Sequence, residues 1–256
     1  MRPLYAFAKK ELTEQARSGK FIILSAIFVV MGIMNPAVAK ITPWLIEALS
    51  DSMLESGMII TVTEVNALDS WIQFFKNAPM LLIAFTLVES NMFTKEYQSG
   101  TLLLTLTKGI ARYKIVIANT MILLLLWSLG YWASFGITYA YNSYFWDNSV
   151  AQNIGASAFF WWLFGAFVVM LMVSFSVLFS SNTAVLLSTG ATVSVFYLFS
   201  LIPKISKYVP IKLTDGNSLI FGTADSDSYL AASLITVCLC MLAFIGSIPV
   251  FNRKQL

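Results

Sequence analysis

Six long apolar runs divide the chain. They lie at about residues 21–38, 71–93, 114–141, 156–179, 183–203 and 229–250. A helix needs about 20 apolar residues to cross a hydrocarbon core about 30 Å thick, and the runs are close to that length or longer. Because they are continuous, unlike the spaced stripes of a globular interior, they predict an all-α integral membrane protein with six transmembrane helices. Residues 1–256 then form a single transmembrane domain.

The polar segments between the runs predict an orientation. The longer segments 39–70, 142–155 and 204–228 alternate along the chain with the loop 94–113 and the turn 180–182, so the two groups lie on opposite sides of the membrane. Most of the 16 Lys and Arg residues lie on the same side of the membrane as the two chain ends: Arg2, Lys9, Lys10, Arg17, Lys20, Lys95, Lys108, Arg112, Lys114, Arg253 and Lys254. Lys and Arg collect near cytosolic span ends, so we expect cytosolic N- and C-termini and three outer loops.

Composition supports the membrane assignment and excludes other classes. Hydrophobic residues make up 58% of the chain and charged residues 11%, whereas soluble domains carry about 25% charged residues. The net charge of +3 is small and scattered, so we expect no nucleic-acid partner, which would need a clustered basic face. Histidine is absent, and Cys238 and Cys240 lie inside the last apolar run, so we expect no metal site.

Residues 1–20 have the pattern of an amphipathic helix. Apolar and small residues recur at helical spacing at Leu4, Tyr5, Ala8, Leu12 and Ala16, and the other side carries Lys9, Lys10, Glu14 and Arg17. This pattern predicts a helix lying in the membrane interface. Its basic residues could bind anionic headgroups, or the helix could be a plain anchor.

The loop 94–113 combines charge, glycine and a short apolar stretch. Glu96 is followed by Gly100 and Thr101, then by the leucine-rich stretch 102–106, and Arg112 closes the loop. The apolar stretch is too short to span a bilayer. It predicts a short helix packed against a neighbour at the membrane face, and that neighbour could be another protein.

At this loop the sequence resembles the membrane subunits of type-2 ATP-binding-cassette transporters. In that family the second span is followed by a Glu, a Gly-Thr pair, a leucine-rich stretch and a closing motif similar to Pro-x-x-Arg. Glu96, Gly100, Thr101 and Arg112 stand in those places, although the proline is absent and Asn119 replaces a frequent lysine. The layout of the amphipathic helix, six spans and long last outer segment also matches the family over nearly the whole chain.

The resemblance implies an export function and a set of partners. Family members pair two membrane subunits, identical or different, with two cytosolic ATPase subunits, and the loop 94–113 would couple them. ATP and Mg would bind on the ATPase, since Gly19-Lys20-Phe21 lacks the pattern of a phosphate-binding loop. The chain would then be no enzyme itself but a permease in a prokaryotic plasma membrane. Its cargo could be an amphipathic peptide, an antibiotic or a lipid, and residues 204–228 could form short helices or a solvated loop.

Glu89 is the one acid clearly inside an apolar run, near the cytosolic end of the second span. A carboxylate at the bilayer centre costs about 2.5 to 3.5 kcal/mol, so intramembrane acids are functional candidates. Near the interface Glu89 could instead pair with Lys95 or Arg112 in a structural role. Both roles stay open.

Two other functions compete with export. An ion-gradient-driven secondary transporter would carry buried charges and broken helices at mid-membrane, for which Lys76, Pro79 and Glu89 give little support. An intramembrane enzyme would need an acid–base set that a chain without histidine or paired acids does not offer. We therefore assign no catalytic, cofactor-binding or metal residue.

Overall fold

The computed structural model describes residues 2–55, 64–98, 100–107 and 109–254. Within these ranges every regular element is helical. The elements are α1 (Arg2–Arg17), α2 (Lys20–Glu55), α3 (Ala67–Glu89), α4 (Asn91–Gln98), α5 (Thr101–Thr107), α6 (Arg112–Phe145), η1 (Asn148–Val150), α7 (Ile154–Leu178), α8 (Asn182–Ser200), α9 (Pro203–Ser206), η2 (Pro210–Thr214), α10 (Gly216–Ile220), η3 (Ser226–Tyr229) and α11 (Leu230–Arg253). Six helices in these ranges are long and apolar enough to cross a membrane, which confirms the predicted fold class.

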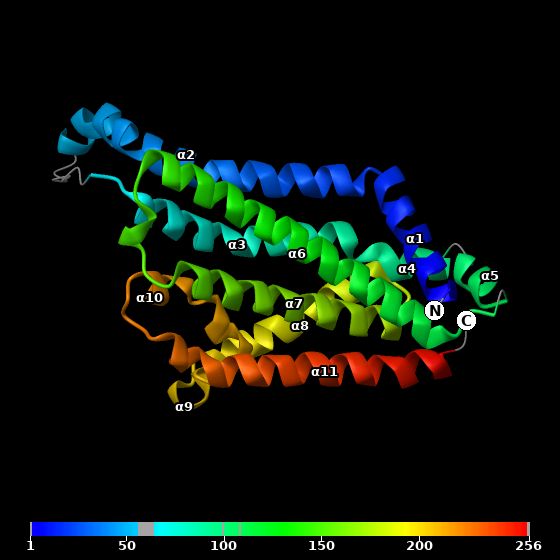
Figure 1. The fold of residues 1–256 in the computed structure, drawn as a ribbon. Helices are drawn as coiled ribbons and strands as arrows, with labels where there is room; N and C mark the ends of the chain where they lie inside the picture. The colour runs from blue at the N-terminus through cyan, green and yellow to red at the C-terminus, as the bar shows by residue number, and fades with distance from the viewer. Residues whose placement is uncertain (1, 56–63, 99, 108, 255–256) are drawn as a thin grey trace.

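The membrane helices α2, α3, α6, α7, α8 and α11 run side by side (Figure 1). Helix α1 and the last turn of α11 lie at one end of the bundle with α4 and α5, whereas α9 and α10 lie at the other end (Figure 1). Helix α7 is central: 72% of its most apolar stretch is buried, compared with 17% for the last span and 11% for α8. The exposed faces of α8 and α11 are left for lipid or another subunit.

Helix α2 extends beyond the first apolar run. It continues past Val38, the expected end of the span, to Glu55, so part of the expected outer loop 39–70 is helical. Pro36 and Pro43 lie inside α2, and each lacks a backbone N–H, which lets a helix bend. Figure 1 shows the last turns of α2 leaving the bundle. Residues 56–63 of that loop lie outside the described residues.

Aromatic side chains fill the core between the central helices. Trp127 on α6 is fully buried, with its ring centroid 6.1 Å from that of Phe28 and 5.6 Å from that of Phe85. Gly165 on α7 makes room for the indole, since a Cβ at this position would lie 2.0 Å from Trp127 Cζ2. Small residues allow such close approach of membrane helices. Gly165 therefore sets the spacing between α6 and α7.

The outer segment 204–228 forms short helices that pack back on the bundle. Leu213, Leu219 and Ile220 are buried against it. Asp215 caps α10 by accepting a hydrogen bond from the Ser218 amide, and the Tyr229 hydroxyl donates to the Asp215 carbonyl over 2.8 Å. These contacts hold the segment against α7 and α3.

Candidate functional site

Helix α1 lies across the end of the bundle and packs on α6 and α2. Among the side chains of α1 whose burial is described, Phe7, Glu11 and Gln15 are buried, each four residues from the next and so on one face of the helix. Leu12, on the apolar side expected from the sequence, is 41% exposed. A largely polar stripe of α1 therefore faces the protein and an apolar residue faces outward.

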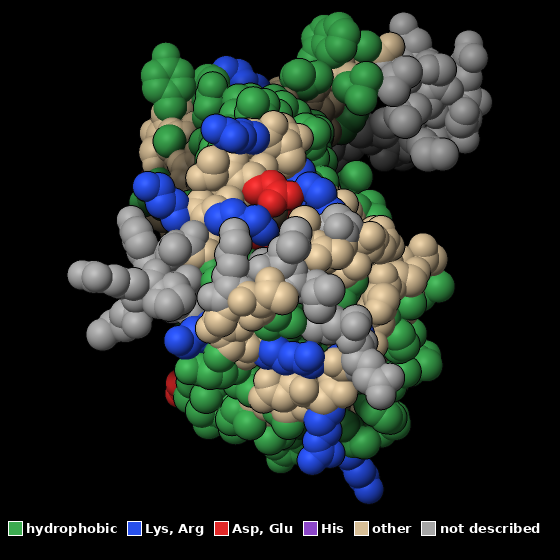
Figure 2. Space-filling model, turned by 90° about the vertical axis from the view of Figure 1, so that its right-hand side faces the viewer, with side chains coloured by type: hydrophobic (Ala, Val, Ile, Leu, Met, Phe, Trp, Pro, Cys, Tyr) green, Lys and Arg blue, Asp and Glu red, His purple; other side chains and the backbone are tan. Residues whose placement is uncertain are grey.

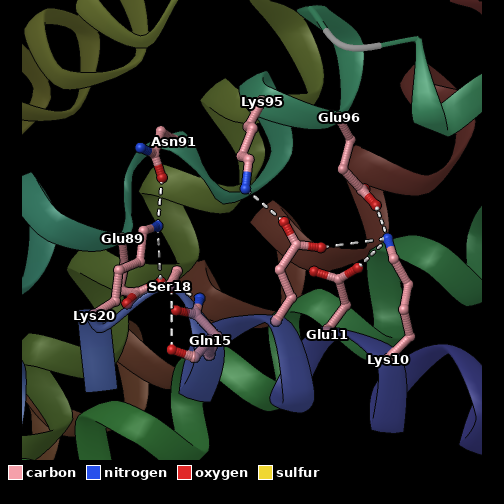
Figure 3. A network of polar contacts seen from close by, with 10 residues as sticks. Lys10, Glu11, Gln15, Ser18, Lys20, Glu89, Asn91, Lys95 and Glu96 are labelled. Atoms are coloured by element: carbon pink, nitrogen blue, oxygen red, sulfur yellow. Dashed lines mark hydrogen bonds and ion pairs between the residues drawn. The ribbon is translucent and has the colours of Figure 1, made fainter. Parts of the chain in front are cut away.

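Two ion pairs join α1 to α4 (Figure 3). The Lys10 ammonium lies 2.7 Å from Glu11 Oε1 and 3.1 Å from Glu96 Oε1. The Lys95 ammonium lies 2.6 Å from Glu14 Oε1. Glu11 and Glu96 are both buried, with 4% and 5% of their surface exposed. Lys10 thus contacts two buried acids that come from different helices.

The local charges favour the ionised forms of Lys10 and Glu14. Partial burial disfavours the Lys10 ammonium, but its hydrogen bond to Glu11 and the charge of Glu96 outweigh that effect and raise the pKa of Lys10 above its ordinary value. The hydrogen bond from Lys95 lowers the pKa of Glu14 below its ordinary value. These groups belong to α1 and α4, which lie at one end of the bundle (Figure 1).

Glu89 is held by α1 and the start of α2. The Gln15 side-chain amide donates to Glu89 Oε2 over 2.6 Å, and the Lys20 ammonium lies 3.8 Å from the same oxygen. The Glu89 side chain is 0% exposed and that of Lys20 19%. Gln15 and Lys20 thus take the place of the two partners expected from the sequence, because α1 folds back over the end of α3.

Arg112 contacts the end of α11, whereas the ion pairs of Glu96 and Lys95 join α4 to α1. Its Nη1 donates to the backbone carbonyls of Phe251, Asn252 and Lys254 over 3.1, 3.1 and 2.7 Å. These carbonyls end α11, where a cation is favourable. Arg112 therefore braces the start of α6 against the end of α11.

Two glycines flank α5. Gly100 has φ +67° and Gly109 has φ +81°, in the left-handed region that favours glycine. Thr101 begins α5 and lines the same cavity as Lys10 and Glu96. Helix α5 is therefore set between two sharp turns, next to the ion pairs of α4.

A cavity of about 180 Å³ lies between α1, α4 and the start of α2. Its lining contains Lys10, Glu14, Lys20, Lys95 and Glu96. Figure 2 looks onto this end of the bundle and shows Lys and Arg side chains around an acidic group. Among the described residues no group of three or more potential ligands is arranged to hold a metal ion.

Sequence reasoning singled out Glu89, Glu96, Gly100, Thr101 and Arg112, and the structure places all but Arg112 around α4 or the cavity. It missed the partners from α1 and α2, which are Lys10, Glu11, Gln15 and Lys20. The usable signal was the spacing of Phe7, Glu11 and Gln15 on one helical face. The coupling roles of the five residues stay predictions.

Two comparisons place the chain among known proteins. A family model described as ABC-2 family transporter protein matches residues 5–239. The uncharacterized transmembrane protein YxlG of Bacillus subtilis (strain 168) is 23% identical over 260 residues, covering 100% of this chain and 99% of the relative. The family match includes most of α1, the loop with α4 and α5, and the first ten residues of α11.

Proposed function

The chain belongs to the ABC-2 family of transporter proteins, as a multi-pass membrane protein of the permease type, and from this premise we propose that it is the membrane subunit of an ATP-driven exporter. Proteins of this family generally work with an ATPase subunit. In the proposal, ATP and Mg bind on separate cytosolic ATPase subunits, and the complex sits in a prokaryotic plasma membrane. A second membrane subunit, a copy of this chain or a related one, completes the passage.

The charge distribution supports a cytosolic position for α1, α4 and α5. These elements lie at the same end of the bundle as the end of α11 (Figure 1). That end carries Lys10, Lys20, Lys95, Arg112 and Arg253, and Lys and Arg mark cytosolic span ends. The ATPase would dock there, against α4 and α5.

The observation that carries the coupling proposal is the chain of contacts from α4 to α3 through α1. Lys10–Glu96 and Lys95–Glu14 join α4 to α1, and Gln15 joins α1 to Glu89 at the end of α3. A displacement of α4 and α5 would therefore move α1 and the inner end of α3 with it. Interfaces held by several discrete contacts shift as units, which suits transmission of an ATPase stroke to a membrane helix.

The spans give an ion-gradient mechanism little support. Secondary transporters use discontinuous helices and charged sites near mid-membrane. Here α3 runs without a break through Pro79, and the buried acid Glu89 lies at its end, paired with Lys20. The cargo in the export proposal is an amphipathic peptide, an antibiotic or a lipid.

The proposal is tested by isolating the chain from native membranes in mild detergent. We expect an ATPase subunit to co-isolate. After reconstitution into vesicles, we expect ATP to drive movement of one of two probes, a fluorescent amphipathic peptide or a fluorescent lipid. Failure to recover any ATPase, together with probe movement by the chain alone down an ion gradient, would establish the secondary-transporter alternative.

The variant Glu96→Gln tests the coupling step. It keeps the side-chain shape but removes the charge that faces Lys10, so we expect ATP hydrolysis to continue while ATP-driven probe movement falls. The matched control Glu64→Gln changes an exposed acid that precedes the start of α3, whereas Glu96 follows the end of α3. Unchanged movement in Glu96→Gln, or an equal loss in the control, would overturn the role assigned to α4.

A further inference from the structure

A second cavity, of about 320 Å³, lies between α6, α7 and α11, away from the polar cavity at the end of the bundle. Ile117, Met121 and Leu124 of α6 form one wall, Ala166 of α7 the floor, and Cys240 and Phe244 of α11 the other wall. Met121 is 61% exposed, so the cavity is a groove open to the hydrocarbon. An apolar, elongated groove of this kind fits an acyl chain.

The charged residues of these three helices all lie at one end of the groove. Arg112 and Lys114 begin α6, Arg253 ends α11, and α7 carries no charge at all. None of the three helices contains Asp or Glu. Lys114 lies three residues before Ile117 and seven before Met121, so it shares their face of α6 at the mouth of the groove. An apolar groove whose three described helices carry basic residues at one end and no acid complements a negatively charged amphiphile.

The bracing of Arg112 keeps this arrangement together. Its bonds to the last carbonyls of α11 hold the start of α6 beside the end of α11, at one end of the groove. Lys114 forms no ion pair with any residue that the structure describes, and its ammonium lies 5.9 Å from the centroid of the Tyr113 ring. Its charge is therefore available to a ligand.

We infer that the groove between α6, α7 and α11 binds an anionic phospholipid, with one acyl chain along the groove and the phosphate at Lys114. Basic pockets between transmembrane helices on the cytosolic side bind anionic headgroups in this way. The assignment to the inner leaflet rests on the orientation in the proposed function, whereas the binding itself does not. The site is separate from the ATPase contact and lies on the outside of the bundle.

The test measures lipid binding to the purified, delipidated chain by native mass spectrometry. Phosphatidylglycerol and phosphatidylcholine with identical acyl chains are titrated separately. We expect phosphatidylglycerol to bind several-fold more tightly. Equal binding of the two lipids would reduce the groove to an unselective lipid contact and overturn the proposal.

Two variants locate the site. Lys114→Gln should weaken phosphatidylglycerol binding about fivefold, the factor that corresponds to about 1 kcal/mol for one basic residue near the surface, and leave phosphatidylcholine binding unchanged. Cys240→Phe should fill the groove and weaken binding of both lipids. The control Lys204→Gln removes an exposed charge from α9, at the other end of the bundle, and should change neither.

Each variant has an outcome that rejects the assignment. Wild-type binding in Lys114→Gln, or an equal loss in Lys204→Gln, would overturn the headgroup position. Wild-type binding in Cys240→Phe would overturn the groove. Because no ATPase is present in the measurement, a negative result leaves the export proposal intact, and failure of the export proposal leaves the lipid result intact.

Discussion

Replacing Lys20 with methionine would remove the ammonium group that faces Glu89. Methionine keeps an unbranched side chain of similar length, so packing at the start of α2 changes little. Glu89 would keep its hydrogen bond from Gln15, at 2.6 Å, but would lose the positive charge 3.8 Å from Oε2. Its carboxylate would then be a buried charge without a counter-ion.

The expected cost follows from the burial of this pair. Removing one partner of a buried ion pair costs about 3–5 kcal/mol, chiefly because the remaining charge stays away from water. The Glu89 side chain is 0% exposed, but the 3.8 Å separation and the retained Gln15 bond place the expected loss near the low end, at about 3 kcal/mol. For a chain of this size the Tm should fall by about 6–12 °C.

The double variant Lys20→Met with Glu89→Gln should recover most of that loss. A neutral glutamine at position 89 still accepts the bond from Gln15 and carries no charge that needs balancing. A double-mutant cycle measures the coupling between the two positions. The control Lys9→Met changes an exposed lysine of α1 that forms no ion pair with the described residues, and it should leave the Tm within about 1 °C.

The assay is thermal unfolding of the purified chain in one detergent, followed by intrinsic tryptophan fluorescence. A Tm for Lys20→Met equal to that of the wild type would refute the argument that Lys20 balances a buried charge. So would a double variant no more stable than Lys20→Met alone. The cycle therefore separates the charge effect from any loss of packing.

Three further predictions concern packing, helix ends and pH. Gly165→Ala would force a Cβ to 2.0 Å from Trp127 and should cost about 1–3 kcal/mol in thermal unfolding, whereas Gly136→Ala, with no neighbour within 4 Å, should be neutral or slightly stabilising. Arg112→Gln should cost about 2 kcal/mol and speed amide hydrogen exchange in the last turn of α11, while exchange at the start of α11 stays unchanged. The Glu14–Lys95 pair should contribute less than about 1 kcal/mol, because it is partly exposed. The folded-state pKa of Glu14 is lowered, so the stabilisation by this pair is complete above the ordinary pKa of about 4.3 and is lost as the pH falls through the folded-state pKa. The melting curves of wild type and Glu14→Gln should therefore converge at acid pH.

The six spans could be predicted because they depend on one local property. A bilayer of fixed thickness requires a minimum apolar length, and that length can be counted along the chain. The extension of α2 beyond the first apolar run could not be predicted by counting apolar residues. Residues 39–55 include Pro43 and several polar side chains, and whether such a segment stays helical depends on what surrounds it.

The candidate site could be predicted only in part, because its contacts join residues that are far apart in the sequence. Glu89 and Glu96 stand out because acids beside apolar runs are rare, but their partners Gln15 and Lys10 lie 74 and 86 residues away in sequence. Those pairs depend on α1 turning back at Gly19, which has φ +73°. No local pattern measures the direction of such a turn.

The face of α1 that contacts the protein shows that an apolar stripe does not always mark the buried side of a helix. In a water-soluble protein the apolar side of a helix is the buried side, because burial removes apolar surface from water. Beside a bilayer, lipid is itself an apolar solvent, so Leu12 can face outward without penalty. Glu11 and Gln15 instead need polar partners that lipid cannot supply, and they find them in Lys10 and Glu89. At the membrane surface the polar stripe, and not the apolar one, therefore indicates where a helix meets its own protein.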